Sequence, residues 1–129
     1  MTPKEEQVRY WLASAEHDLD TAQDLFDKGR YDWCLFIGHL VLEKILKGYY
    51  LQKTGNNPPY THSLSVLAEK IGIDLSKEQL GLLEKATDFN LEARYPDKKL
   101  SFYKICDKRF AQPYFERIKE FHGWMLKKF

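Results

Sequence analysis

The stretch from Asp32, its expected N-cap, to Lys53 constrains the fold most, because its apolar residues recur at helical spacing on two separate sides. With about 100° of rotation per residue, one side carries Trp33, Ile37, Leu40, Val41, Gly48 and Leu51. The other side carries Leu35, Leu42, Leu46 and Tyr49, and a strip of His39, Glu43 and Lys47 separates the two. Such a helix is either central to its own bundle or shared between a core and a partner chain. In a chain this small we expect sharing, which predicts a homodimer formed through this helix.

The sequence on either side of this stretch predicts two more helices. Thr2 and Pro3 form a helix opening, an N-cap hydroxyl followed by proline at the first helical position. Gly29 is expected to end that helix. After a loop rich in Asn and Pro, Thr61 is expected to cap a short helix that ends near Gly72.

The second half of the chain predicts two further helices. Ser76 with Gln79 resembles a capping box and opens a helix that must stop before Pro96, because proline disfavours helical dihedrals in the preceding residue. Residues 97–101 are predicted to form a linking loop. Pro113 lies either in the first turn of the last helix or at a kink within it. The apolar positions of that helix are Phe110, Tyr114, Ile118, Phe121 and Met125.

No strand-like alternation of useful length occurs, so the predicted fold is all-α, an up-and-down antiparallel bundle of four to five helices. Its 129 residues are expected to form one domain, residues 1–129. The aromatic content is high, 15% of the chain, and most of these residues fall on helical faces. We therefore assign them to the core or to the dimer interface.

The charge balance excludes a protein that coats nucleic acid by charge alone. There are 20 Lys and Arg against 19 Asp and Glu, a net charge of +1. The longest mostly apolar run, residues 33–42, is about half of what a membrane span needs. The N-terminus lacks the apolar stretch of a signal peptide, and two cysteines are too few for a disulfide framework. We expect a cytoplasmic protein that does not bind a membrane.

The sequence contains none of the short motifs that hold a metal or a common cofactor. No Glu-x-x-His, His-x-x-x-His or Cys-x-x-Cys pattern occurs. A glycine-rich phosphate loop and a nucleophile elbow are also missing. The prediction is therefore no metal ligand, no cofactor and no assigned catalytic residue.

The strip of His39, Glu43 and Lys47 is the first candidate site. It is consistent with an ordinary surface ion pair at i,i+4 spacing, with the histidine as a neighbour. Alternatively, because it lies between two apolar sides, it is a polar groove in an assembly. In that case Lys44 and Lys47 meet a phosphate, and Glu43 fixes a lysine or a ribose hydroxyl.

Two more places offer polar groups suited to a phosphate or a base. A helix C-terminus explains Arg94, because a positive charge is favourable there, but it does not explain Tyr95. An arginine beside an aromatic ring can also bind a phosphate through its guanidinium while the ring stacks on a base. Asp97 follows closely and is included in this candidate site. His62, after the Asn- and Pro-rich loop, is either a first-turn surface residue or a site residue.

Four segments taken in order resemble a HEPN domain, the nucleotide-binding helical domain of higher eukaryotes and prokaryotes. They are Trp11 with Ala15-x-x-Asp18-Leu19-x-x-Ala22, Arg30–Phe36 running into Leu42–Gly48, Pro59–Leu64, and Asn90–Asp97. The resemblance spans nearly the whole chain. It implies a helical bundle, frequent homodimers and pairing with a minimal nucleotidyltransferase, often as a toxin–antitoxin system. It also implies that part of the superfamily cleaves RNA.

The sequence departs from the family pattern at two points. Many members carry a Gln-Gln pair where this chain has His39 and Leu40. The ribonuclease branch carries an arginine and a histidine separated by four to six residues. Arg117 and His122 have that spacing but lie about 140° apart on a helix, so we interpret the match as accidental.

The function predicted from the sequence is therefore a homodimeric module that binds a nucleotide or an RNA phosphate and partners a nucleotidyltransferase. The expected ligand contacts are Glu43, Lys44, Lys47, His62, Arg94, Tyr95 and Asp97. Lys44, Lys47 and Arg94 are expected to converge on one groove. The alternatives are a metal-independent ribonuclease toxin, which would use either Arg117 with His122 or Arg94 with His62 brought together by folding, or a purely structural dimeric interaction protein.

Overall fold

The structure, a computed structural model, describes residues 1–129 apart from the side chains of residues 96–99. Its helices are α1 (Pro3–Asp27), α2 (Tyr31–Thr54), α3 (Leu64–Ile71), α4 (Lys77–Arg94), α5 (Pro96–Ile105) and α6 (Lys108–Leu126). No strand occurs in the backbone so described. The predicted all-α fold is confirmed.

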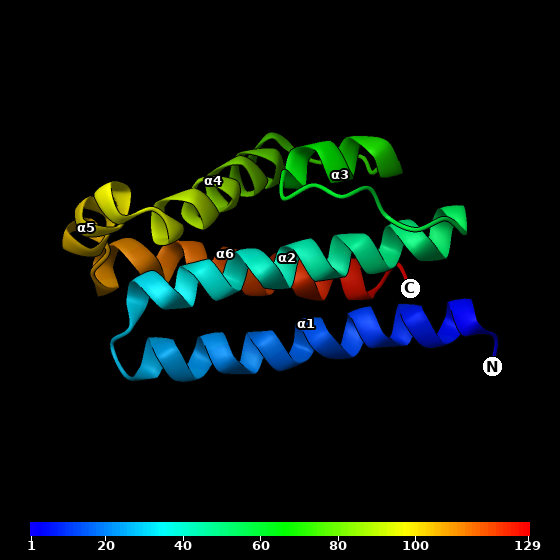
Figure 1. The fold of residues 1–129 in the computed structure, drawn as a ribbon, viewed down its shortest axis with the longest axis horizontal. Coiled ribbons are helices and arrows are strands. Elements are labelled where there is room, and N and C mark those ends of the chain that lie inside the picture. Colours follow the sequence, from blue (N-terminus) through cyan, green and yellow to red (C-terminus); the bar gives the residue numbers. More distant parts are fainter.

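Four long helices, α1, α2, α4 and α6, alternate in direction along the chain and form the bundle (Figure 1). The short helices α3 and α5 lie toward opposite ends of it, and both chain termini lie at the same end. Helix α2 is the central element, because it packs against α1, α3, α4 and α6.

The position of α2 corrects the expectation that one of its two apolar sides belongs to a partner chain. Val41 and Leu51 of that side are buried within this chain, as are Leu35, Leu42 and Leu46 of the other. Trp33, Ile37 and Leu40 remain only partly covered. Most of α2 is therefore core, and a half-exposed strip near its N-terminus is what remains for any partner.

Several helix ends are formed by the predicted residues. The Thr2 hydroxyl accepts a hydrogen bond from the Glu5 amide at 3.1 Å, and Gly29 adopts a φ of 77° after α1. Both hydrogen bonds of the capping box between Ser76 and Gln79 are present at the start of α4. These ends were predictable because each depends only on residues a few positions apart.

Other local predictions were wrong. Asp32 is not the cap of α2, because that helix begins at Tyr31 and its N-cap residue makes no side-chain hydrogen bond. Ser63 rather than Thr61 caps α3, while the Thr61 hydroxyl accepts from the Ser63 amide at 3.1 Å. The predicted linking loop 97–101 falls within α5.

The sequence leaves the position of Pro113 open between the first turn of the last helix and a kink within it. The structure places Pro113 inside α6, beyond its first turn.

Helix α5 is joined to the bundle by aromatic packing. Phe102 of α5 stacks on Phe89 of α4 with ring centroids 5.5 Å apart, and Phe110 and Tyr114 of α6 meet the same Phe89 edge-on. Aromatic pairs of this geometry add stability beyond the area that they bury. The high aromatic content is thus explained largely by the core.

Candidate functional site

The carboxylate of Glu43 is the centre of a polar cluster between α2 and the start of α3. The i,i+4 spacing places His39, Glu43 and Lys47 in one row on α2. Glu43 Oε1 accepts a hydrogen bond from His62 Nδ1 at 2.8 Å, and Glu43 Oε2 accepts from Lys47 Nζ at 3.4 Å. His39 Nε2 lies 4.0 Å from the same Oε1. Since Glu43 is buried, the cluster is an internal charge network and not a surface ion pair.

His39 supports the segment that carries His62. Its ring is fully buried, and Nε2–H donates to the His62 carbonyl oxygen at 3.1 Å, which fixes the tautomer because a carbonyl only accepts. Burial lowers the pKa of His39, although the His62 carbonyl and the Glu43 carboxylate oppose that shift. Nδ1 is buried without a hydrogen-bond partner among the described residues. His39 is therefore a neutral positioning residue, which the sequence analysis placed in the strip but not among the ligand contacts.

His62 is the member of the cluster that reaches solvent, with 45% of its side chain exposed. Its Nδ1 must carry the proton that it donates to Glu43, because an ionised carboxylate only accepts. Tyr60 lies beside it, with ring centroids 6.1 Å apart in an edge-to-face arrangement. No hydrogen bond to Nε2 is found among the residues that the structure describes. This nitrogen is available to a ligand.

The two candidate lysines face different neighbours. Lys44 Nζ donates to Asp18 of α1 at 2.6 Å, so it links α1 to α2 and is not part of the cluster. Lys47 contacts Glu43 and also lies over the Trp11 ring, 6.0 Å from its centroid. A phosphate at either lysine has to compete with a carboxylate that is already in place.

Arg94 and Tyr95 do not join the cluster. Both are exposed at the C-terminal end of α4, which Figure 1 places next to α5 at one end of the bundle. The Thr87 hydroxyl bonds the amide of Leu64, close to His62, whereas Arg94 lies seven residues further along α4, about 10 Å. The predicted convergence of Lys44, Lys47 and Arg94 on one groove is therefore not found. The Asp97 side chain lies outside the described residues.

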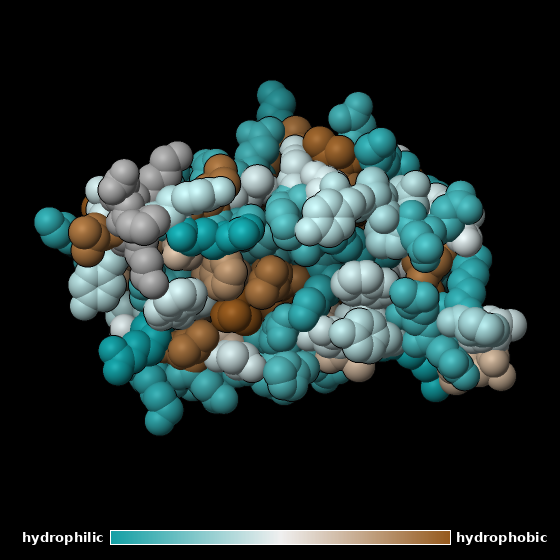
Figure 2. Space-filling model, in the orientation of Figure 1, coloured by the Kyte–Doolittle hydropathy of each residue, from teal (hydrophilic) through white to brown (hydrophobic). Residues whose placement is uncertain are grey.

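The N-terminal half of α2 carries a partly exposed apolar strip, which precedes Lys44 on the same helix. Trp33, Phe36, Ile37 and Leu40 follow at spacings of three and four, all partly exposed, and Lys44 continues the same row. Figure 2 shows an apolar patch over this part of the molecule, bordered by hydrophilic side chains. We call these four residues the outer strip of α2.

The described residues offer no other obvious reactive group. Burial raises the pKa of both Cys34 and Cys106 to about 12, so these thiols are protonated at neutral pH. Within the same part of the chain, no three His, Cys, Asp or Glu residues are grouped to hold a metal ion. No helix found there is long and apolar enough to span a membrane.

Arg117 and His122 lie on different faces of α6, as their spacing predicted. Arg117 lines a groove between α4 and α6. His122 is buried, and burial lowers its pKa against the opposing charge of Glu16 on α1. The structure does not bring this arginine and this histidine together.

Comparison with known proteins identifies the family. The model of the HEPN domain matches residues 8–129. The fold resembles TT1696 from Thermus thermophilus, with 21% identity, a TM-score of 0.82 and coverage of 95% of this chain and 98% of that one. It also resembles ST0689, an archaeal HEPN homologue, with 24% identity, a TM-score of 0.66 and coverage of 94% and 96%. No curated protein matches. Because the family model spans nearly the whole sequence, the chain belongs to the HEPN domain family.

Proposed function

We propose that this HEPN protein binds a phosphate group of a nucleotide or of RNA at the cluster between α2 and α3. The observation that carries the proposal is His62, whose Nδ1 is held by buried Glu43 while 45% of its side chain is exposed; Lys47 bonds to the other oxygen of the same carboxylate. A protonated imidazole and an ammonium group are both suitable partners for a phosphate oxygen. Of the residues expected to contact the ligand, Glu43, Lys47 and His62 form this cluster, and Lys44 borders it.

The proposal includes a homodimer formed through the outer strip of α2. These four partly exposed apolar residues form a row on one helix, a pattern typical of a helix that packs on another helix. A twofold contact uses the same surface on both copies, so the Lys44 of each would approach the other chain. Because Lys44 of each copy is paired with its own Asp18, such a pairing would place two Lys44–Asp18 ion pairs beside the contact.

Pairing with a minimal nucleotidyltransferase, in a toxin–antitoxin arrangement, is the part of the proposal that rests on the family. Arg94 and Tyr95, which are exposed at the far end of α4, then belong to a second contact surface and not to the phosphate site. Co-purification of this chain with the product of an adjacent nucleotidyltransferase gene tests this part. Complete loss of the complex in an Arg94→Ala, Tyr95→Ala double variant is the expected result.

Thermal unfolding with added ATP or a short RNA tests the phosphate site. A ligand present at 100 times its Kd stabilises the native state by about 2.7 kcal/mol, so the melting temperature should rise by several degrees. His62→Ala and Lys47→Ala should abolish the shift, whereas Lys70→Ala, an exposed lysine on α3, should retain it. An unchanged melting temperature across a panel of nucleotides and RNAs would refute the phosphate site.

Ribonuclease activity without a metal is the second candidate, and the orientation of His62 is the observation that favours it. A histidine whose Nδ1–H is held by a carboxylate has its Nε2 available to take or give a proton. Cleavage of a structured RNA that is lost in both His62→Ala and Glu43→Gln would support this activity. Equal cleavage by His62→Ala and the wild type would exclude His62 as the acid or base.

A further inference from the structure

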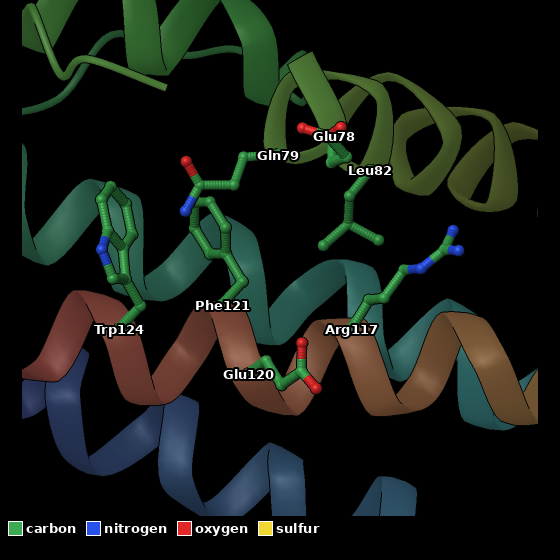
Figure 3. A pocket seen from close by; sticks show the side chains of 7 residues that line it. All are labelled: Glu78, Gln79, Leu82, Arg117, Glu120, Phe121 and Trp124. Carbon is green, nitrogen blue, oxygen red and sulfur yellow. The ribbon is translucent and has the colours of Figure 1, made fainter. Parts of the chain in front are cut away.

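A groove between α4 and α6 lies apart from the cluster described above. Its volume is about 500 Å³, within the usual range for small-molecule sites. Figure 3 shows the lining side chains, which are Glu78, Gln79, Leu82, Arg117, Glu120, Phe121 and Trp124. A smaller hollow of about 330 Å³ shares Glu78, Leu82 and Arg117 and extends the groove to Gly81, Lys85 and Tyr114.

The groove has an apolar floor and one aromatic wall. Leu82 of α4 and Phe121 of α6 are buried at its base. The indole of Trp124 packs against Phe121 with ring centroids 5.6 Å apart, and Lys128 Nζ lies 4.2 Å from the indole centroid. A Cβ added to Gly81 would meet nothing within 4 Å, so the space beside α4 is open. A flat apolar ring would cover this floor and stack beside the indole.

The charged side chains around the groove have no ion-pair partners among the described residues. Glu78 and Glu120 stand on opposite rims, and Arg117 lies toward the end away from Trp124 (Figure 3). Lys85 lines the adjoining smaller hollow. Gln79 uses its Oε1 in the capping box of α4, so its amide nitrogen remains for a ligand. With Lys128 over the indole, two acids and three bases surround the groove, so it presents charges of both signs to a ligand.

The spacing of Trp124, Glu120 and Arg117 along α6 indicates how long a ligand must be to contact all three side chains. Trp124 and Arg117 are seven residues apart, about 10 Å along the helix axis, and Glu120 lies between them. An aromatic surface, a carboxylate and a guanidinium therefore follow one another within the reach of one small molecule.

We propose that the groove between α4 and α6 binds a small aromatic zwitterion, of which a free aromatic amino acid is the simplest form. The ring lies on Leu82 and Phe121 beside Trp124. The ammonium group is held by Glu120, and the carboxylate by Arg117, as charge-assisted hydrogen bonds. A nucleoside monophosphate fits the charges less well, because it has no ammonium group for Glu120 and its phosphate would be repelled by Glu78 and Glu120. The proposal does not depend on the phosphate site near His62.

A nuclear magnetic resonance titration of the whole chain with L-tryptophan tests the assignment. We expect the indole N–H of Trp124 and the side-chain amide of Gln79 to shift, with the resonances around His62 unchanged. Tryptamine lacks the acid, indole-3-propionate lacks the amine and L-leucine lacks the ring, so each should bind about tenfold or more weakly than L-tryptophan.

Charge-removing variants with matched controls identify which end of the ligand each residue holds. Arg117→Ala should weaken L-tryptophan about tenfold and leave tryptamine unchanged, whereas Arg109→Ala, exposed on the same helix, should change neither. Glu120→Gln should weaken both amines and leave indole-3-propionate unchanged, with Glu116→Gln as its control. All four positions are exposed, so the fold should be retained.

Three results would overturn the proposal. The first is the absence of any shift at Trp124 and Gln79 with millimolar L-tryptophan. The second is equal affinity for L-leucine, which would remove the aromatic requirement. The third is tighter binding of guanosine monophosphate than of L-tryptophan at the same resonances, which would contradict the charge assignment.

Discussion

The cluster at Glu43 and the groove between α4 and α6 differ in whether their charged side chains form ion pairs within the chain. At the cluster, a buried carboxylate has its partners built in, because His62 and Lys47 both bond to it. Around the groove, Glu78, Glu120, Arg117 and Lys85 have no ion-pair partner among the residues described. A paired, buried network holds elements of the fold together, whereas unpaired charges over an apolar floor are free to meet a ligand. The difference predicts large stability effects in the first region and small ones in the second.

The largest effect is expected at Glu43. Glu43→Ala should lower the free energy of unfolding by about 3 kcal/mol, because it leaves the buried Lys47 ammonium without its acceptor and removes the bond that holds His62. Chemical denaturation measures the loss. The matched change in the groove, Glu120→Ala, should stay within about 0.5 kcal/mol of the wild type. Equal losses at the two positions would remove the distinction between the regions.

Packing around α2 should show the second largest effect. A Cβ at Gly48 would lie 2.9 Å from Trp11 Cβ, an atom next to the α1 backbone, so Gly48→Val should cost about 2 kcal/mol through overpacking. Gly81→Val on α4 meets open space and should change stability by less than about 0.5 kcal/mol. Denaturation midpoints of the two variants, measured side by side, check this contrast.

Acidification should weaken the fold through the buried histidines. The folded-state pKa of His39 lies below its ordinary value of 6.5, and burial is the largest cause. The unfolded chain therefore binds more protons, and stability falls as the pH drops below about 6.5. The slope contributed by one histidine is at most about 1.4 kcal/mol per pH unit.

Thermal unfolding between pH 7 and pH 5 measures this slope for His39. His39→Gln keeps an N–H for the His62 carbonyl and should flatten the slope, and His17→Gln, at an exposed histidine on α1, should not. His122 contributes in the same direction and should account for the slope that remains. A slope unchanged in His39→Gln would contradict the assignment.

The smallest expected effect is a gain in stability, whereas the preceding ones are losses. Gly81→Ala should stabilise the protein by up to about 1 kcal/mol, because alanine has the higher helix propensity and its Cβ meets no other atom. Gly29→Ala is the contrasting variant, since a φ of 77° strains any residue with a Cβ and should lower stability. Calorimetric melting temperatures distinguish a gain from a loss.

The predictable part of the structure was the part that depends on near neighbours in sequence. The capping box of Ser76 and Gln79 and the positive φ of Gly29 each involve a few consecutive residues. The choice between Thr61 and Ser63 as the cap of α3 depends on how the loop meets α2 and α4, and there the prediction was wrong.

The candidate site was only partly predictable for the same reason. The row of His39, Glu43 and Lys47 follows from i,i+4 spacing, but its meeting with His62 joins residues 19 positions apart. Lys44 lies next to Glu43 in the sequence and yet bonds to Asp18 on another helix. Adjacent residues on a helix point about 100° apart, so their partners are decided by whichever helices pack on each side.

The sequence by itself determined the helices, most of their ends and the membership of the HEPN family, because helical periodicity and short motifs are local properties of the chain. Only the tertiary structure decided that α2 is central, that Lys44 bonds to Asp18 of α1 and that α4 and α6 leave a groove. Those features depend on which helices, distant in sequence, bury their apolar sides against one another. Many arrangements of amphipathic helices satisfy one periodicity, and side-chain packing selects among them.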